Sequence, residues 1–272
     1  MPARQQRWHR RLPRFLSALA AVALLACPAA GAAPEPTREV IFNAADGVRL
    51  HGDLYLGTEP KSGPVILLFH QAGANARAEY APLAGRLTEK GYNLFAIDQR
   101  VGGSRLGGEN RTVAGLGGKE YSYCEAMPDL EAALDYLDAQ GYTGAKAVWG
   151  SSYSAALVLS LAAARGSGLK AVLAFSPASG GPLAECRGED VAAEVKIPVL
   201  VMRPESEMAL ESSQAQRDIF INHGFDFYVA PNGVHGSSML NPARVEGNVE
   251  GSWRVVLEFL AKHLPAREPG AE

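Results

Sequence analysis

From residue 38 onward, apolar segments with the character of strands alternate with segments of helical periodicity. The segment at 65–69 reads Val-Ile-Leu-Leu-Phe, a continuous apolar run typical of a strand buried on both faces. A helix is expected at 77–90, because Gly91 follows it as a stop signal. The alternation predicts a mostly parallel sheet covered by helices on both faces. We expect further strands at 92–97, 145–149, 169–175, 199–202 and 225–229, and further helices at 128–140, 154–165, 208–222 and 252–263.

The first two expected strands form a hairpin. The segments 38–43 and 48–56 flank Ala-Ala-Asp-Gly at 44–47, and Asp-Gly between two alternating runs is a strong turn signal. The sequence therefore predicts eight strands, mostly parallel, with an antiparallel hairpin at the N-terminal end. Only about twenty residues separate Ser176 from Ile197, too few for a large lid, so an open site is expected.

The composition fits one globular domain. The chain has 272 residues, of which 47% are hydrophobic, enough for a sizeable core. No repeat or compositional shift marks a second domain. We expect the domain to span 38–264, after a short linker at 33–37 and before a disordered tail at 265–272. The segment 98–127 contains seven glycines and is expected to be a long loop of the kind that is often functional or mobile.

The first 32 residues have the order of a secretory signal peptide. Five arginines precede an apolar run at 15–26, and small residues follow at 29–33. Cleavage is expected after Ala32, which makes the protein exported, either periplasmic or secreted. An alternative is lipidation at Cys27, which ends the lipobox-like sequence Leu-Leu-Ala-Cys. The apolar run of about a dozen residues is shorter than a membrane-spanning helix requires, so no spanning segment is expected.

The net charge limits which partners the protein can bind, and the cysteine content limits which disulfides it can form. Removal of residues 1–32 leaves 21 basic and 29 acidic residues, a formal charge of −8, which disfavours binding to nucleic acid. Cys124 and Cys186 then form an even pair in a compartment that permits disulfides. Two alternatives stay open at this stage: a Cys124–Cys186 bridge, or two separate thiols.

The fifth expected strand runs directly into Gly-Ser-Ser-Tyr-Ser at 150–154 and then into a helix. A sharp strand-to-helix turn exposes one nucleophilic side chain, provided that the residues two before and two after it are small. Gly150 and Ser154 meet that requirement for Ser152, whereas Ser151 would have aromatic residues at both crowded positions. Ser152 is therefore the predicted nucleophile. The alternative is a serine that acts only as a helix cap.

A serine hydroxyl needs a base to take its proton, so this interpretation requires a histidine. His235 follows the last expected strand, where a loop can bring its imidazole to the edge of the sheet. The order along the chain, serine before histidine, fits the same type of site. The remaining histidines have less suitable positions: His9, His51, His70, His223 and His263.

The base in turn needs a carboxylate that holds its ring in one tautomer. Glu207 and Glu205 both follow the expected strand at 199–202. Glu207 is the preferred candidate and Glu205 the reserve. The alternative is a pair of ordinary surface glutamates.

Acyl transfer also needs N–H donors that are fixed in advance for the oxyanion. One candidate is the N–H of Tyr153, at the start of the helix after Ser152. The second is the N–H of Ala72, in the His-Gln-Ala-Gly loop that follows the strand at 65–69. We expect the side chain of Gln71 to reach the substrate and the ring of His70 to bond to the loop backbone.

Four motifs in this order resemble the α/β-hydrolase superfamily, in particular its dienelactone-hydrolase-like branch. The motifs are Phe-His-Gln-Ala-Gly at 69–73, Ala-Ile-Asp-Gln-Arg at 96–100, Trp-Gly-Ser-Ser-Tyr-Ser at 149–154 and Gly-Val-His-Gly at 233–236. The resemblance covers residues 38–264 and implies the α/β-hydrolase fold, with the acid at Glu207. Dienelactone hydrolases themselves use cysteine at the position that Ser152 holds.

The resemblance implies an enzyme without a cofactor or metal, a serine hydrolase that cleaves a carboxylic ester or related acyl bond of a small molecule. A peptidase or lactonase on the same scaffold is an alternative, because the fold does not fix the bond that is cleaved. A non-catalytic binding module that retains the scaffold is a second alternative. The sequence has no closely spaced histidine or cysteine ligands, so no metal site is expected.

Overall fold

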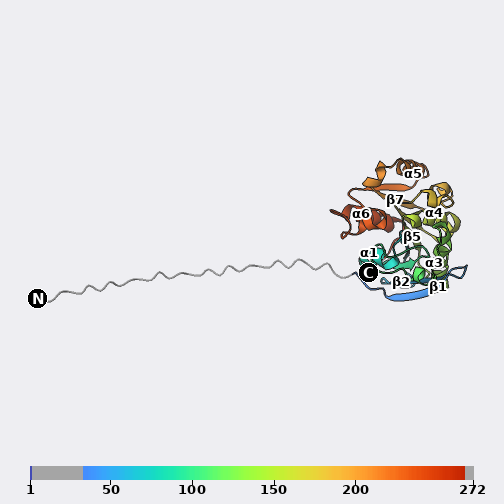
Figure 1. Cartoon of the computed structure of the whole chain (residues 1–272), viewed down its shortest axis with the longest axis horizontal. Coiled ribbons are helices and arrows are strands. Elements are labelled where there is room, and N and C mark those ends of the chain that lie inside the picture. Colours follow the sequence, from blue (N-terminus) through green and yellow to red (C-terminus); the bar gives the residue numbers. More distant parts are fainter. Residues whose placement is uncertain (2–32, 267–272) are drawn as a thin grey trace. The chain divides into compact units, whose positions relative to one another are not determined.

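Figure 1 shows the chain in a computed structural model, which describes Met1 and residues 33–266. The predicted signal peptide, including Cys27, lies outside the described residues apart from Met1, as does the predicted tail from residue 267 on. Residues 33–37 form no helix or strand. At the other end, Ala266 was expected in the tail but packs against the core.

The sheet has eight strands in the order β1-β2-β4-β3-β5-β6-β7-β8. The hairpin of β1 and β2 is antiparallel, and β2 is also antiparallel to β4. All other neighbouring strands are parallel, which confirms the mostly parallel eight-stranded sheet. The strands are β1 (Arg38–Asn43), β2 (Arg49–Tyr55), β3 (Val65–Phe69), β4 (Asn93–Asp98), β5 (Lys146–Ser151), β6 (Ala171–Phe175), β7 (Val199–Pro204) and β8 (Asp226–Ala230).

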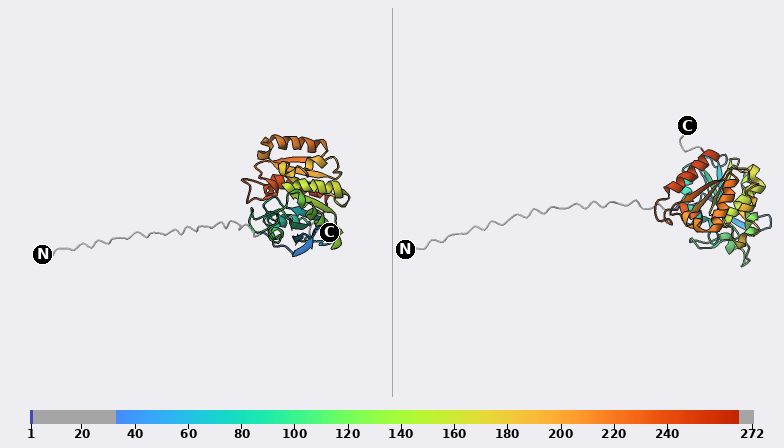
Figure 2. Two further views of the ribbon diagram at one scale, coloured as in Figure 1. Left: turned by 45° about the vertical axis from the view of Figure 1, so that its right-hand side comes forward. Right: turned by 90° about the horizontal axis from the view of Figure 1, so that it is seen from above.

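Helices cover both faces of the sheet, as the views in Figure 2 show. The helices are α1 (Ala76–Thr88), α2 (Arg111–Ala114), α3 (Met127–Ala139), α4 (Tyr153–Arg165), α5 (Glu211–Asn222) and α6 (Glu250–His263). Side chains of α3, α4 and α5 pack on one face, and side chains of α1 and α6 pack on the other. Within residues 33–266, the helices are all too short or too polar to cross a membrane.

The central strands are apolar throughout because both of their faces are buried. Along β3, Val65, Leu67 and Phe69 belong to the core under α3 and α4, while Ile66 and Leu68 belong to the core under α1. This division follows from the pleat, which points successive side chains to opposite faces. Packing in the two cores fixes which side chains of each strand point to each face of the sheet. It therefore also fixes where the residues at the end of each strand lie.

The carboxyl ends of the parallel strands meet at one edge of the sheet. The residues that follow β3, β5, β6, β7 and β8 therefore come together there, although they are far apart in sequence. Binding sites of parallel sheets lie outside this edge.

Two elements differ from the sequence-based expectation. The helix expected from residue 208 begins at Glu211, because Glu205–Ala209 forms a separate 3-10 helix. The long loop at 98–127 contains the short helix α2, which Asn110 caps by accepting a hydrogen bond from Val113 N–H at 2.8 Å.

Buried ion pairs hold this long loop to the sheet. Arg100 pairs with Asp46 of the first hairpin and with Asp129 of α3. Arg111 pairs with Asp53 of β2 at 2.8 Å and with Asp98 of β4 at 2.6 Å. The ion pairs therefore tie the loop to the rest of the domain near its start and at its middle.

A disulfide between Cys124 and Cys186 connects the long loop to the segment between β6 and β7. Of the two alternatives that the sequence left open, the structure contains the bridge, with the Cα atoms 5.7 Å apart. The neighbouring Tyr123 stacks on Tyr153, the first residue of α4, with ring centroids 4.8 Å apart. Cys124 of the bridge is thus next in sequence to Tyr123, whose ring contacts the residue that follows Ser152.

Candidate active site

Ser152 occupies the turn between β5 and α4, and its backbone is in a conformation that non-glycine residues rarely adopt, with φ 60° and ψ −119°. Hydrogen bonds to the chain after β6 hold it there. Ser152 N–H donates to Phe175 O at 2.8 Å, and Ser152 O accepts from Ala178 N–H at 3.2 Å. A half-buried side chain on a strained turn of this kind matches a nucleophile elbow.

The small residues on either side of the elbow are required by close contact. A Cβ on Gly150 would lie 2.3 Å from the backbone oxygen of Ser154. Ser154 is fully buried, and its hydroxyl donates to His70 O at 2.6 Å. A serine at this position therefore fits the turn and also links it to the loop after β3.

Glu207 lies on the 3-10 helix after β7, and its Oε1 is 2.6 Å from Nδ1 of His235. Its second oxygen, Oε2, accepts from Nη1 of the buried Arg203 at 2.6 Å. Burial alone would raise the pKa of Glu207, but the hydrogen bond from His235 and the charges of His235 and Arg203 outweigh it, and the pKa lies below its usual value. Glu207 is thus ionised at neutral pH and holds the imidazole by one nitrogen.

Glu205 has a different environment. Its side chain is exposed and has no hydrogen-bond or ion-pair partner among the residues from 33 to 266. Of the two glutamates proposed from the sequence, only Glu207 contacts the histidine.

The loop that carries His235 is anchored on the elbow. Ser237 N–H donates to Oγ of Ser151 at 3.0 Å, and Gly236 N–H donates to Oγ of Ser176 at 3.0 Å. Gly236 has φ +66°, and a Cβ on it would lie 2.3 Å from Ser151 Oγ, so only glycine fits this approach. In the described chain, the hydroxyl of Ser152 makes no hydrogen bond with His235, a contact that often forms fully only when substrate binds.

The loop after β3 forms a tight turn over residues 71–74, closed by Ala74 N–H donating to Gln71 O at 3.2 Å. Gly73 has φ +70°, as the third position of a type II turn requires. Neither Ala72 N–H nor Tyr153 N–H has an acceptor within residues 33–266. Both predicted oxyanion donors are therefore available.

His70, which directly precedes this turn, is fully buried. Its Nε2 accepts from Gln99 N–H at 3.1 Å, so its Nδ1 carries the proton and donates to Gln71 O at 2.9 Å. Burial lowers the pKa of His70, which keeps the ring neutral. This is the structural role expected from the sequence.

Gln71 was expected to reach the substrate, but its side chain is only 5% exposed. Its Nε2 donates to Oε1 of Glu79 at 3.2 Å and to Oγ of Ser238 at 3.4 Å. The amide is thus directed into the protein, toward α1 and the segment after His235.

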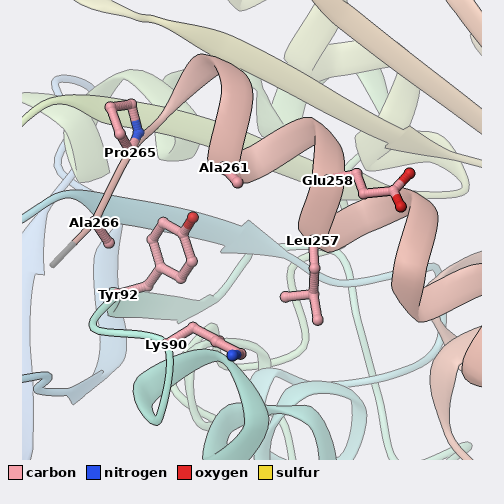
Figure 3. Close-up of a pocket in the computed structure, with 7 residues that line it drawn as sticks. All are labelled: Lys90, Tyr92, Leu257, Glu258, Ala261, Pro265 and Ala266. Carbon is pink, nitrogen blue, oxygen red and sulfur yellow. The ribbon is translucent and has the colours of Figure 1, made fainter. Parts of the chain in front are cut away.

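The described residues contain no group of three histidine, cysteine or acidic side chains that could hold a metal ion. Figure 3 shows a pocket between α6 and the segment before β4. Lys90 and Tyr92 of this pocket precede β4, so it lies at the amino edge of the parallel strands, opposite the edge that carries Ser152.

No known family profile matches the sequence, and no curated protein matches it. Solved structures do share its fold. The α/β hydrolase GrgF from Penicillium sp. sh18 has a TM-score of 0.66 at 15% identity, over 84% of this chain and 98% of that one. Est1E from Butyrivibrio proteoclasticus has a TM-score of 0.63 at 15% identity, over 83% and 98%. The chain has the α/β-hydrolase fold.

The esterase Pf2001 from Pyrococcus furiosus is similar as well, with a TM-score of 0.62 at 17% identity over 83% of this chain and 90% of that one. The match covers at least 90% of each of these three structures. In this topology the Ser152 turn follows the central strand β5, and Glu207 and His235 follow β7 and β8.

Sequence reasoning missed three residues around this candidate site. Ser176, directly after β6, accepts from Gly236 N–H, and its hydroxyl helps to lower the pKa of Glu207. Arg203 holds Glu207 and also donates to Pro177 O and to the side chain of Gln216. The third is Glu79 of α1, which is fully buried. Ser176 had a detectable signal, since it follows a buried strand at the edge where Ser152 lies, but nothing in the sequence marks Arg203 or Glu79.

Proposed function

We propose that the protein is a serine hydrolase that cleaves a carboxylic ester or a related acyl bond through an acyl-enzyme. Ser152 is the nucleophile, His235 the base and Glu207 the acid. The strongest support is the 2.6 Å hydrogen bond between Nδ1 of His235 and Oε1 of Glu207, in a loop bonded to the residue before Ser152. The same pair argues against a binding module, which has no need of an oriented histidine.

The contact with Glu207 determines what His235 can do. Because the ionised carboxylate only accepts, Nδ1 carries the proton and Nε2 is left with a lone pair. Nε2 takes the proton of Ser152 as Oγ bonds to the acyl carbon. The leaving alcohol then receives that proton, and a water molecule, activated in the same way, releases the acid product.

The negative charge that develops on the acyl oxygen is stabilised by two backbone donors. These are Tyr153 N–H, at the N-terminus of α4, and Ala72 N–H, in the turn at 71–74. Both lack acceptors within the described chain, and both belong to segments fixed by buried hydrogen bonds. Donors that are held in advance lower the barrier without a cost of reorganisation during the reaction.

An ester is the proposed substrate because the similar structures include one named an esterase. We place the protein in the dienelactone-hydrolase-like branch on its four motifs, with serine in place of that branch's cysteine. The proposed substrate is a small acyl compound, and no cofactor takes part. A formal charge of −8 without the leader argues against nucleic acid as a partner.

The protein is proposed to act outside the cytoplasm, after cleavage following Ala32 or after lipidation at Cys27. The disulfide between Cys124 and Cys186 supports an oxidising compartment, because structural disulfides are rare in reducing ones. Intact mass of protein recovered from the producing cells would distinguish the two forms of processing.

Labelling with a fluorophosphonate probe tests the proposal. Wild-type protein should be labelled on Ser152, and the substitutions Ser152→Ala and His235→Ala should abolish labelling. His223→Ala is the matched control, since His223 is an exposed histidine at the end of α5 and should leave labelling unchanged. Folded wild-type protein that resists the probe would instead indicate the binding module. A series of p-nitrophenyl esters of increasing chain length would then define the acyl preference.

A further inference from the structure

The proposed mechanism leaves one buried acid without a role. Glu79 lies in the first turn of α1 and is 1% exposed. An acid in a first turn often bonds to the free N–H groups of its own helix, but here the side-chain oxygens bond elsewhere. A buried carboxylate is costly unless it is fully hydrogen-bonded, so its partners indicate what it serves.

The first partner is the loop that carries the proposed oxyanion donor. Oε2 of Glu79 accepts from Gln71 N–H at 2.7 Å, and Oε1 accepts from Nε2 of Gln71 at 3.2 Å. Gln71 begins the turn and directly precedes Ala72. The carboxylate therefore fixes the peptide next to the N–H that must point at the substrate.

The second partner is the nucleophile elbow. The hydroxyl of Ser151 lies close enough to Glu79 to lower the pKa of that carboxyl, and its oxygen accepts from Ser237 N–H at 3.0 Å. Because that oxygen is already an acceptor, its single proton is directed to the carboxylate. The result is a relay from Ser237 N–H through Ser151 to Glu79, which joins the residue before Ser152 to the loop that carries His235.

The charged and titratable groups that interact with Glu79 come from three segments. Arg244, after the His235 loop, is the nearest cation, and its guanidinium donates to Ser238 Oγ at 3.1 Å and to Ala78 O at 2.6 Å. Tyr80 of α1 and Tyr153 of α4 are the other titratable groups that interact with it. Burial raises the pKa of Glu79, while the hydrogen bonds from Ser151 and Gln71 and the charge of Arg244 oppose that rise.

We propose that Glu79 is a positioning residue that sets the distances between the oxyanion turn, the nucleophile elbow and the histidine loop. This inference rests on the proposed hydrolase function. The three segments leave the sheet from β3, β5 and β8. Glu79 is hydrogen-bonded to the first, interacts with the Ser151 hydroxyl of the second, and is linked to the third by the hydrogen bond from Ser237 N–H to Ser151. Its effect is thus on the geometry in which the reaction occurs, without contact to the substrate.

The substitution Glu79→Gln tests this with little change in volume. The groups that face the Glu79 side chain, from Gln71 and Ser151, are all hydrogen-bond donors. The NH2 group of glutamine cannot accept from any of them, so either the contact with Gln71 or the relay through Ser151 is lost. A displacement of about 1 Å between reacting groups can cost about 100-fold in rate. We therefore expect Glu79→Gln to lower kcat and the rate of fluorophosphonate labelling about 10- to 100-fold and to leave KM within about twofold.

Asp53→Asn is the matched control. Asp53 is as buried as Glu79, and it pairs with Arg77 and Arg111, with no hydrogen bond to the turn at 71–74 or to Ser151 among the described residues. Both arginines keep other acidic partners after the substitution, namely Glu39 and Asp98. This variant should lose stability but keep the wild-type rate of labelling.

The full-length protein and its variants are compared by p-nitrophenyl acetate kinetics, labelling rate and thermal unfolding. A selective loss of kcat and labelling in Glu79→Gln, absent from Asp53→Asn, supports the inference. Equal rates in Glu79→Gln and wild type, or equal losses in both variants, overturn it while the hydrolase function stands. Wild-type protein that neither labels nor hydrolyses overturns both proposals. If Glu79→Gln does not fold, Ser151→Ala breaks only the relay, and a wild-type labelling rate in that variant also overturns the inference.

Discussion

Loss of the disulfide between Cys124 and Cys186 should destabilise the folded protein by a predictable amount. The two cysteines are 62 residues apart in sequence, and the bridge closes that loop in the unfolded chain. The chain-entropy relation for a loop of this length gives about 4 kcal/mol at 25 °C. In a domain of this size, 1 kcal/mol corresponds to about 2–4 °C in melting temperature. The double substitution Cys124→Ala/Cys186→Ala should therefore melt roughly 8–16 °C below the wild type.

Thermal and urea unfolding of oxidised protein, protein treated with dithiothreitol and the double variant would measure this effect. Reductant should lower the stability of the wild type to that of the double variant and should leave the double variant itself unchanged. Activity should also fall on reduction, because Tyr123, which stacks on the first residue of the elbow helix, is next to Cys124. A wild type whose melting temperature moves by less than about 2 °C on reduction would refute the reasoning.

The site supports further predictions. Glu207→Gln should lower kcat about 10³- to 10⁴-fold, because an amide favours the wrong imidazole tautomer, whereas the exposed Glu205→Gln should match the wild type; the opposite ranking would move the acid to Glu205. Since the folded protein holds the pKa of Glu207 below its usual 4.5, the contact with the imidazole stabilises fully above about pH 4.5 and is lost as the pH falls further. Urea midpoints between pH 3 and pH 7 should accordingly fall more steeply in the wild type than in Glu207→Gln, and parallel curves would contradict this. Gly236→Ala should lower kcat about tenfold or more, because the added Cβ meets a hydroxyl oxygen at 2.3 Å. Gly181→Ala, where an added Cβ meets nothing within 4 Å, should leave kcat unchanged.

Much of the fold could be predicted because its signals are local. The run Val-Ile-Leu-Leu-Phe of β3 is apolar at every position since both faces of the strand are buried, and that is visible in one dimension. The elbow was equally visible, because a strand, a small-residue turn and a helix follow one another without a gap. Near residue 208 the sequence suggested the start of one helix, whereas the structure has a 3-10 helix at Glu205–Ala209 before α5 begins at Glu211.

The supporting residues of the site could not be predicted in the same way. Glu79 stands between alanine and tyrosine in a helix whose apolar periodicity is weak, so its sequence position is that of a solvent-facing acid. It is buried only because three chain segments that are distant in sequence meet at its carboxylate. The choice between Glu207 and Glu205 likewise depended on how a short 3-10 helix turns its side chains, a property of tertiary contact with His235 and Arg203.

The order of the strands has a consequence for how the proposed catalytic site forms. β6, β7 and β8 join the sheet one after another on the same side of β5. A nascent chain that ended before β7 would already contain Ser152, both proposed oxyanion donors and both bridged cysteines, yet it would lack the acid and the base. The proposed catalytic site is therefore complete only when the outermost strands, the last to be synthesised, have joined the sheet.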